Sequence, residues 1–337
     1  MADAQAFGAH SLSKPYASSA SDYLHRWKQS LLIISAICCV FAYNLIWTSN
    51  VRMSTKTSST AEGLPTSIWN DSRSLSTTGI TVDKALEDST RSQSLIAIGC
   101  AITSKKLYDV SYDNIGEKFQ FFHVFLPTFC DTSSAHYTYR FYLAYDHDDD
   151  VFTNQRLRDA FQRQFYSTTT SGVCRDRRII TNLSLVQCNY SGKPAWAQND
   201  AMLEAYLDHV DYFYRINDDT LMLTRGWTEK FIATLESYDP PSVGVVGPNS
   251  TGDWVTFLTY EFVHHTHVDI FGFYYPRLFS DWFGDMWITF VYQPNRSTKP
   301  GEVRLAHTHS LGRRYEIYSK YQHVGSRVAY DKSIVNR

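Results

Sequence analysis

Residues 210–220, VDYFYRINDDT, decide the expected fold. Their aromatic and β-branched run is typical of a buried strand, and adjacent carboxylates follow where the run ends. In open α/β sheets, ligands bind at the edge where strands stop and loops begin. Two carboxylates at that edge favour a hard divalent cation, which commonly bridges phosphate oxygens. The alternative is a solvated turn, because Asn and Asp are common in turns.

Strands and helices are expected to alternate around this stretch. Residues 95–100 and 137–145 precede it as strand candidates, and a stripe of apolar residues at helical spacing runs over 195–210. Residues 243–246 form a further apolar strand candidate. This alternation predicts an α/β domain with a mostly parallel sheet and helices on both faces.

Length and composition are those of a globular protein. The 337 residues suffice for one large domain or two small ones. Hydrophobic residues make up 43% and charged residues 20% of the chain. The formal net charge of −2 gives no electrostatic reason to expect a nucleic acid partner.

The N-terminal part has the pattern of a membrane anchor followed by a stem. Residues 31–47, LLIISAICCVFAYNLIW, contain no charge. We therefore expect a transmembrane helix at 30–48, after a cytosolic tail at 1–29. A cleaved signal peptide and a buried core helix are the alternatives. The Ser- and Thr-rich residues 49–92 predict a flexible stem. The folded domain is expected at 93–325, followed by a C-terminal tail at 326–337.

Two further features fit a lumenal domain. Five Asn-X-Ser/Thr sequons, each a potential glycan acceptor, occur at Asn70, Asn182, Asn189, Asn249 and Asn295. Outside the apolar run, four cysteines remain, an even number compatible with two disulfides in an oxidising lumen: Cys100, Cys130, Cys174 and Cys188. Cys174 and Cys188 would close a short loop, but spacing alone leaves the connectivity open.

The organisation of residues 192–219 is similar to that of a known superfamily. Residues 192–200, GKPAWAQND, and their helix lead into the strand that ends in Asn217-Asp218-Asp219. This resembles the GT-A superfamily of nucleotide-sugar glycosyltransferases, in which a Gly-containing turn and a helix with an early Asn precede the DxD motif. The resemblance covers roughly residues 94–320. It implies a Rossmann-like GT-A domain in a type II membrane protein of the Golgi or ER. It further implies Mn²⁺ or Mg²⁺ as metal, a nucleoside-diphosphate sugar as donor, and a glycan or glycoprotein as acceptor.

The same resemblance implies a set of metal ligands. Asp219 is expected to be the main ligand, because Asn217 replaces the first acid of the motif with an uncharged amide. Asp218 is expected on the metal or on a sugar hydroxyl. In many GT-A enzymes a late His supplies a third ligand, here His307 or His309. Neutral imidazole suits Mn²⁺ better than Mg²⁺.

For the nucleotide, the resemblance implies an acidic side chain at the end of an early strand. Asp146 and Asp148 match that position, and their alternative is an exposed acidic turn. Asn199 is the early Asn of the helix and is expected on the donor side. Arg313 and Arg314 could meet the diphosphate, since guanidinium groups match phosphate oxygens, or could equally be solvated.

Inverting transfer needs a base that takes the proton of the acceptor hydroxyl. Residues 280–288, SDWFGDMWI, resemble the aromatic-Gly-acid stretch that opens a helix in inverting GT-A enzymes. Asp285 takes the position of the base, with Asp281 in reserve. The alternative is a charge that stabilises a helix N-terminus. The aromatic residues Trp282, Phe283 and Trp287 could form a stacking wall for an acceptor sugar or belong to the core.

Two other functions compete with this interpretation. His267 and Asp269, with His307 or His309, match the two-His-one-carboxylate spacing of non-haem iron/2-oxoglutarate oxygenases. That chemistry usually occurs in a jelly roll, which has few helices. A non-catalytic carbohydrate-binding module would explain the aromatic residues but not a base beside a metal site.

Overall fold

The computed structural model describes residues 93–251, 255–308, 312 and 314–335. From the N-terminus its elements are β1 (Leu95–Ala101), α3 (Ile115–Lys118), the π-helix η1 (Phe121–Phe125), α4 (Leu126–Thr132), β2 (Thr138–Tyr145), α5 (Asp150–Thr153), α6 (Gln155–Thr169), α7 (Gly172–Asp176), β3 (Ile180–Gln187), α8 (Pro194–Leu207), β4 (Tyr212–Arg215) and β5 (Thr220–Met222). They continue with α9 (Trp227–Glu236), β6 (Val245–Val246), β7 (Asn249–Thr251), β8 (Phe262–His264), α10 (Thr266–Phe271), α11 (Gly284–Tyr292), β9 (Ser297–Thr298), β10 (Arg304–His307) and α12 (Gln322–Val335).

The expected mixed α/β fold with a mostly parallel sheet is confirmed. The main sheet has seven strands in the order β3-β2-β1-β4-β8-β6-β9. Strands β3, β2, β1 and β4 are mutually parallel, and β6 is parallel to β9, whereas β8 runs antiparallel to β4 and β6. The parallel strands bring the C-terminal ends of β1, β2 and β4 to one edge, where Asp146 and Asn217 follow.

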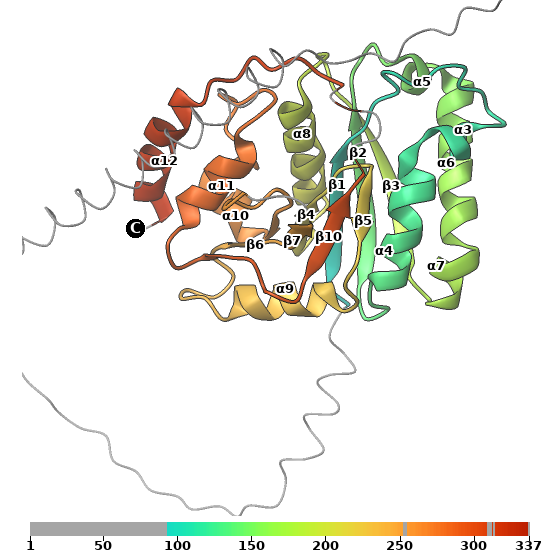
Figure 1. Ribbon diagram of the computed structural model, residues 1–337. Helices are drawn as coiled ribbons and strands as arrows, with labels where there is room; N and C mark the ends of the chain where they lie inside the picture. Colours follow the sequence, from blue (N-terminus) through green and yellow to red (C-terminus); the bar gives the residue numbers. More distant parts are fainter. Residues whose placement is uncertain (1–92, 252–254, 309–311, 313, 336–337) are drawn as a thin grey trace, which may run out of the picture. The chain divides into compact units, whose positions relative to one another are not determined.

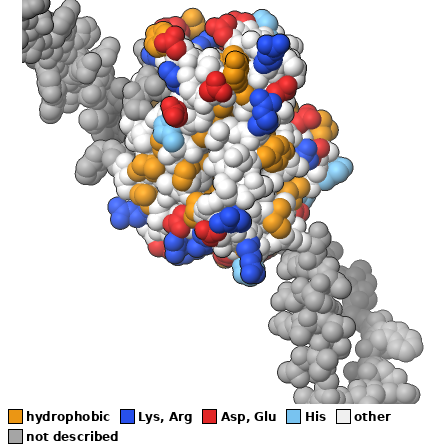
Figure 2. Space-filling view, turned by 90° about the vertical axis from the view of Figure 1, so that its right-hand side faces the viewer, with side chains coloured by type: hydrophobic (Ala, Val, Ile, Leu, Met, Phe, Trp, Pro, Cys, Tyr) orange, Lys and Arg blue, Asp and Glu red, His pale blue; other side chains and the backbone are white. Residues whose placement is uncertain are grey.

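Each face of the sheet has its own hydrophobic core, because side chains alternate along a strand. In β2, Phe141 and Leu143 face one core and Tyr142 and Ala144 face the other. The first core is covered by α4, α6 and α7, and the second by α8 and α11 (Figure 1). On the α6 and α7 side, acidic and basic side chains are intermixed (Figure 2), so this face has no large field of one sign.

A small second sheet brings the late part of the chain to the end of β4. Its strand order is β5-β10-β7, and β10 runs antiparallel to β5 with His307 opposite Thr220. The backbone N–H of Thr308 also donates to the Asp219 carbonyl over 3.3 Å. Residues nearly ninety positions apart in the sequence thus become neighbours. The spacing of apolar residues in the sequence did not predict this pairing of β5 with β10.

The cysteine pairing differs from the suggested one. A disulfide joins Cys130 of α4 to Cys174 of α7, with their Cα atoms 4.8 Å apart, so the suggested Cys174–Cys188 pair is wrong. Cys100 and Cys188 are buried free thiols. The expectation of two disulfides is therefore not met by these four cysteines.

The predicted C-terminal tail is also corrected. Most of 326–337 belongs to helix α12, which packs against α11. The buried Asp331 carboxylate accepts a 2.8 Å hydrogen bond from Trp287 Nε1, and Arg327 pairs with the same oxygen at 2.5 Å. The folded domain therefore extends to at least Val335.

The predicted cytosolic tail, anchor and stem all lie outside the described residues. Within the part of the chain that the structure describes, no helix is long and apolar enough to cross a membrane.

Candidate functional site

The Asn217–Thr220 segment is a turn, but its acids are not solvated. The Thr220 N–H donates to the Asn217 carbonyl, and the Asn217 N–H donates to the Thr220 hydroxyl, both over 3.3 Å. Asp218 is only 2% exposed and Asp219 only 8%. Burying a carboxylate is costly unless a cation or hydrogen bonds compensate. The two interpretations of this stretch, turn and ion site, are therefore compatible.

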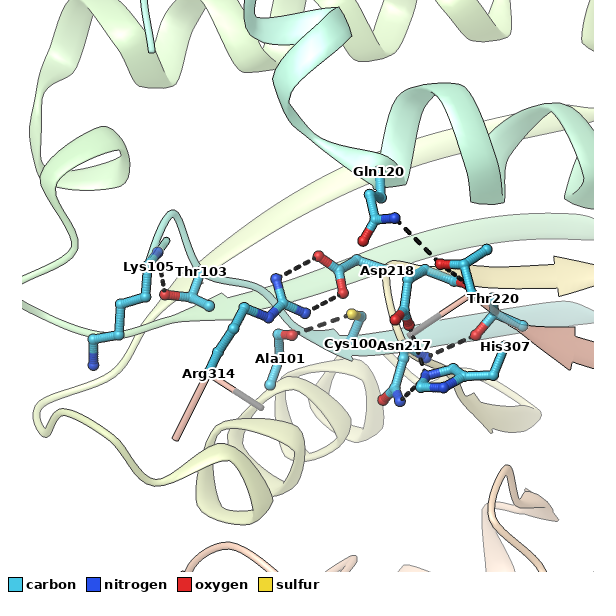
Figure 3. Close-up of polar contacts among 12 residues, drawn as sticks. Cys100, Ala101, Thr103, Lys105, Gln120, Asn217, Asp218, Thr220, His307 and Arg314 are labelled. Carbon is cyan, nitrogen blue, oxygen red and sulfur yellow. Dashed lines mark hydrogen bonds and ion pairs between the residues drawn. The ribbon is translucent and has the colours of Figure 1, made fainter. Parts of the chain in front are cut away.

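His307 meets Asp219 at this turn. Its Nε2 lies 2.8 Å from Asp219 Oδ1 and 3.2 Å from the Asn217 amide nitrogen (Figure 3). Burial raises the pKa of Asp219, but the adjoining His307 imidazole and the Arg314 guanidinium outweigh burial, so that pKa lies below its ordinary value. The structure thus brings together three of the four predicted metal ligands, while His309 lies outside the described residues.

Asp218 instead forms an ion pair with Arg314. The guanidinium makes two contacts, Nη1 to Oδ2 at 2.8 Å and Nη2 to Oδ1 at 2.5 Å (Figure 3). Burial would lower the pKa of Arg314, but the charge and hydrogen bonds of Asp218 outweigh burial, so that pKa lies above its ordinary value. Removing one partner of such a buried pair leaves an uncompensated charge. Arg314 is thus part of the site, whereas Arg313 lies outside the described residues.

The side chains that meet at Asp219 could serve as ligands of a divalent cation. Its Oδ1 is buried and lies 2.8 Å from the His307 Nε2 atom. Neighbouring ligands of an octahedral ion at about 2.1 Å lie about 3 Å apart, close to the Asp219–His307 separation. Half a turn of the Asn217 amide would present its oxygen to the same place. No three His, Cys, Asp or Glu side chains in the described part are grouped to hold a metal, so phosphate or water oxygens would have to complete the coordination.

A basic pocket with a cavity volume of about 460 Å³ borders this turn. It is lined by Lys105, Ser191, Gly192, Lys193, Arg314, Tyr315, Glu316 and Tyr318. The α8 helix begins beside it at Pro194, and a helix N-terminus favours anions. Three cationic side chains and a helix N-terminus make the pocket suitable for a phosphorylated ligand.

Asp146 lies where the sequence predicted, beneath this pocket. It is 2% exposed, pairs with Lys105 Nζ at 2.9 Å and accepts the Gly192 N–H over 3.0 Å. Asp148 is exposed, and a hydrogen bond from Ser191 lowers the pKa of its carboxyl. Both acids thus contact residues that line the pocket, but only Asp146 is buried.

Two predicted site residues have other contacts. The Asn199 side-chain oxygen is buried and accepts the N–H groups of Tyr274 and Tyr275, which fixes α8 to that loop. Asp281 accepts the N–H groups of Tyr318 and Ser319. Burial raises the pKa of Asp281, but these hydrogen bonds and one from Ser280 lower it below its ordinary value. The structure thus gives Asn199 a positioning contact, and a weakly basic Asp281 suits a loop anchor better than a base.

Asp285 has the surroundings of a stronger base. It lies in the first turn of α11 and is half-buried, and its Oδ1 accepts the Met286 N–H over 2.8 Å. Burial raises the pKa of Asp285, and Arg215 only partly opposes that. A carboxyl with a raised pKa accepts a proton more readily.

Sequence reasoning missed two charged residues beside Asp285. Arg215 is the last residue of β4, and Glu261 is fully buried immediately before β8. The signal was present as a charge inside an apolar run, in YFYRI and in TYEFV. A charge at such a position is either paired or functional.

The aromatic stretch divides between core and surface. Trp287 is fully buried, whereas Trp282 is 51% exposed. The Phe283 ring contacts Tyr321 with the centroids 5.8 Å apart. Trp282 therefore remains the candidate for a stacking surface, and Trp287 belongs to the core.

The alternative iron site is not assembled. His267 is buried, with Nδ1 3.0 Å from the Tyr292 hydroxyl and Nε2 2.9 Å from the Tyr274 carbonyl. Asp269 pairs with His265 at 2.8 Å. Both ring nitrogens of His267 are engaged within the core, which leaves neither available to iron.

A scan of the chain against protein-family models finds no match, and a search among curated proteins finds no relative.

Proposed function

We propose that this protein is a metal-dependent glycosyltransferase of the GT-A type, which moves a sugar from a nucleoside-diphosphate sugar to a glycan or glycoprotein. The observation that carries the proposal is the arrangement at the end of β4. The Asp219–His307 contact and the Asp218–Arg314 pair adjoin a basic pocket at the C-terminal edge of the parallel strands. Phosphorylated ligands of α/β sheets bind at that edge.

The pocket supplies what a nucleoside diphosphate needs. Lys193 and Arg314 provide positive charge for the two phosphates. Tyr318, which is 63% exposed, offers an aromatic face on which a base can stack. Asp146 is already compensated by Lys105 and the Gly192 N–H, so it does not repel the anion.

Asp219, His307 and Asn217 would hold Mn²⁺ or Mg²⁺ beside the phosphates. The metal, when bound, stabilises the negative charge of the departing diphosphate. Arg314 has a second role in this scheme. Its guanidinium neutralises Asp218 in the absence of donor and lines the same pocket, so it can exchange that carboxylate for phosphate oxygens.

Asp285 takes the proton of the acceptor hydroxyl while the hydroxyl oxygen attacks the anomeric carbon. The new glycosidic bond forms as the bond to the diphosphate breaks, with inversion of configuration. The half-buried position of Asp285 leaves it within reach of an acceptor, and the exposed Trp282 next to α11 offers that acceptor an apolar face.

The cellular setting of the proposal follows from the sequence. An apolar run at 30–48 would anchor the chain as a single-pass type II protein, with the domain in the Golgi or ER lumen. The Cys130–Cys174 disulfide is compatible with such an oxidising compartment.

A thermal-shift panel tests the proposal. Full-length protein in detergent is heated with each of a set of nucleotide sugars, with and without Mn²⁺, and in a separate arm with Fe²⁺ and 2-oxoglutarate. We expect stabilisation by at least one nucleotide sugar that requires Mn²⁺ and is lost in Asp219→Ala. Stabilisation only by Fe²⁺ and 2-oxoglutarate would overturn the proposal, and no response in either arm would favour a carbohydrate-binding module.

A further inference from the structure

Glu261 is a buried carboxyl whose compensation is incomplete. It is fully buried, and its Oε2 accepts the Tyr275 hydroxyl over 2.8 Å. Its Oε1 has no hydrogen-bond partner among the described residues. An ionised carboxylate in such a place is expensive, so the group tends to keep its proton.

Tyr275 connects Glu261 to the start of α11, where Asp285 lies. The ring of Tyr275 packs on Gly284, the residue before Asp285, so closely that a Cβ there would lie 2.9–3.0 Å from ring carbons. Only glycine fits at that position without a shift of the ring. The hydroxyl of the same side chain holds Glu261. The position of the α11 N-terminus therefore depends on Tyr275, whose hydroxyl binds the Glu261 carboxyl group.

Arg215 is the cation whose charge acts on both acids. Its backbone N–H donates to the Glu261 carbonyl over 2.9 Å. Its guanidinium is fixed by the Gln198 side chain at 3.0 Å and by the Thr259 carbonyl at 2.6 Å. Burial would lower the pKa of Arg215, but the acidic groups around it, among them Tyr275, Glu261 and Asp285, outweigh burial and raise that pKa. Two carboxyl groups therefore share one fixed positive charge.

The other groups that face Glu261 are tyrosines. Besides Tyr275, they are Tyr274, whose hydroxyl donates to the Glu261 carbonyl, with Tyr214 and the neighbouring Tyr260. Burial raises the pKa of Tyr214, Tyr274 and Tyr275 well above its ordinary range, which keeps them neutral. The charge balance of this buried region is thus set by Arg215, Glu261 and Asp285.

We propose that Glu261 is a positioning residue for Asp285: it carries the proton of this carboxyl pair, so that Arg215 serves as counter-ion to an ionised Asp285 that is ready to accept a proton. The order of protonation follows from burial, because Glu261 is sealed from solvent while Asp285 is half-buried. Burial and the charge of Asp285 raise the pKa of Glu261 to about 7, against the opposing effect of Arg215. This inference rests on the proposed function, since a ready base is needed only if transfer occurs.

An infrared titration of the full-length protein in detergent tests the coupling without any sugar donor. In the wild type, the absorption of one protonated carboxyl should disappear with a midpoint near pH 7, and this signal should be missing in Glu261→Gln. Asp285→Asn removes a neighbouring negative charge, so the midpoint should move to lower pH. Tyr275→Phe removes a hydrogen bond that favours ionised Glu261, so the midpoint should move to higher pH. Glu236→Gln, which changes an exposed glutamate on α9, is the matched control and should leave the signal in place.

Transfer measured against pH supplies the second readout. The wild-type rate should show an inflection near pH 7 that Glu261→Gln lacks, which a merely structural role would not produce. A carboxyl signal that persists in Glu261→Gln, or a midpoint unmoved by Asp285→Asn, would overturn this inference even in an active transferase. A coupled titration in a protein that transfers no sugar would instead overturn the proposed function, and with it the role of Asp285 as base.

Discussion

The two carboxylate pairs of this domain differ in how their charge is compensated. Asp218 and Asp219, at the end of β4, each have a cationic or imidazole partner of their own, whereas Glu261 and Asp285 share the single guanidinium of Arg215. Burial raises the pKa of all three acids, but His307 and Arg314 outweigh burial at Asp219, so its pKa is lowered, whereas Arg215 only partly opposes burial at Glu261 and Asp285, so theirs are raised. The balance between burial and nearby positive charge thus separates a carboxylate suited to bind a metal from carboxyl groups suited to handle a proton.

The largest expected effect comes from removing Asp219, the proposed metal ligand of the first pair. Asp219→Ala should abolish Mn²⁺-dependent nucleotide binding and reduce transfer by at least about 10³-fold, because the charge of the leaving diphosphate is no longer compensated. Calorimetric titration with a nucleoside diphosphate and Mn²⁺, together with a transfer assay, measures both losses. Asp176→Ala, which removes an exposed acid on α7, is the control. Undiminished turnover in the Asp219 variant would contradict the assignment.

In the second pair, Asp285→Asn should lower turnover by about 10²–10⁴-fold while leaving donor affinity intact, because only proton transfer is lost. Asp281→Asn is a useful comparison, since that carboxylate holds the Tyr318 and Ser319 backbone and should affect thermal stability more than turnover. Turnover and donor affinity are measured separately by steady-state kinetics and calorimetry. A collapse of donor affinity in Asp285→Asn would show that this residue belongs to the donor site.

These two pairs were not equally visible in the sequence. Strand ends and a helix start are local patterns, and they predicted the positions of Asp146, Asp219 and Asp285. His307 reaches the site through the pairing of β10 with β5, two short strands that are distant in the sequence. The pattern of apolar residues within a segment does not show which distant strand that segment pairs with. The sequence did not predict Glu261 as a site residue for another reason. Its role depends on the groups that surround it in the folded protein, and a single charged residue in an apolar run does not identify those groups.

Within the first pair, the contribution of Arg314 to stability can be isolated. Arg314→Ala should lower the free energy of unfolding by about 3 kcal/mol, because Asp218 is left buried without its counter-charge. The double variant Asp218→Asn/Arg314→Ala should recover part of that loss, since no buried charge remains. Denaturant unfolding at constant pH measures all three proteins. A double variant no more stable than the single one would show that Arg314 stabilises the fold by packing and not by charge.

A further effect, at most as large as that of Arg314→Ala, concerns the pH dependence of stability, where the two pairs should differ in sign. The folded protein keeps the Glu261 proton up to a pKa of about 7, whereas the ordinary value is 4.5. This contribution to stability is therefore fully present below about pH 4.5 and is lost as pH rises through 7. Glu261→Gln has no such loss, so its stability relative to the wild type should rise over that interval by up to about 3 kcal/mol.

The pKa of Asp219 is lowered instead, so the stability that Asp219 contributes is lost as pH falls. The advantage of the wild type over Asp219→Asn should therefore shrink toward acid pH. Unfolding curves at a series of pH values decide this, and trends of the same sign for both variants would mean that counter-charges do not distinguish the two pairs.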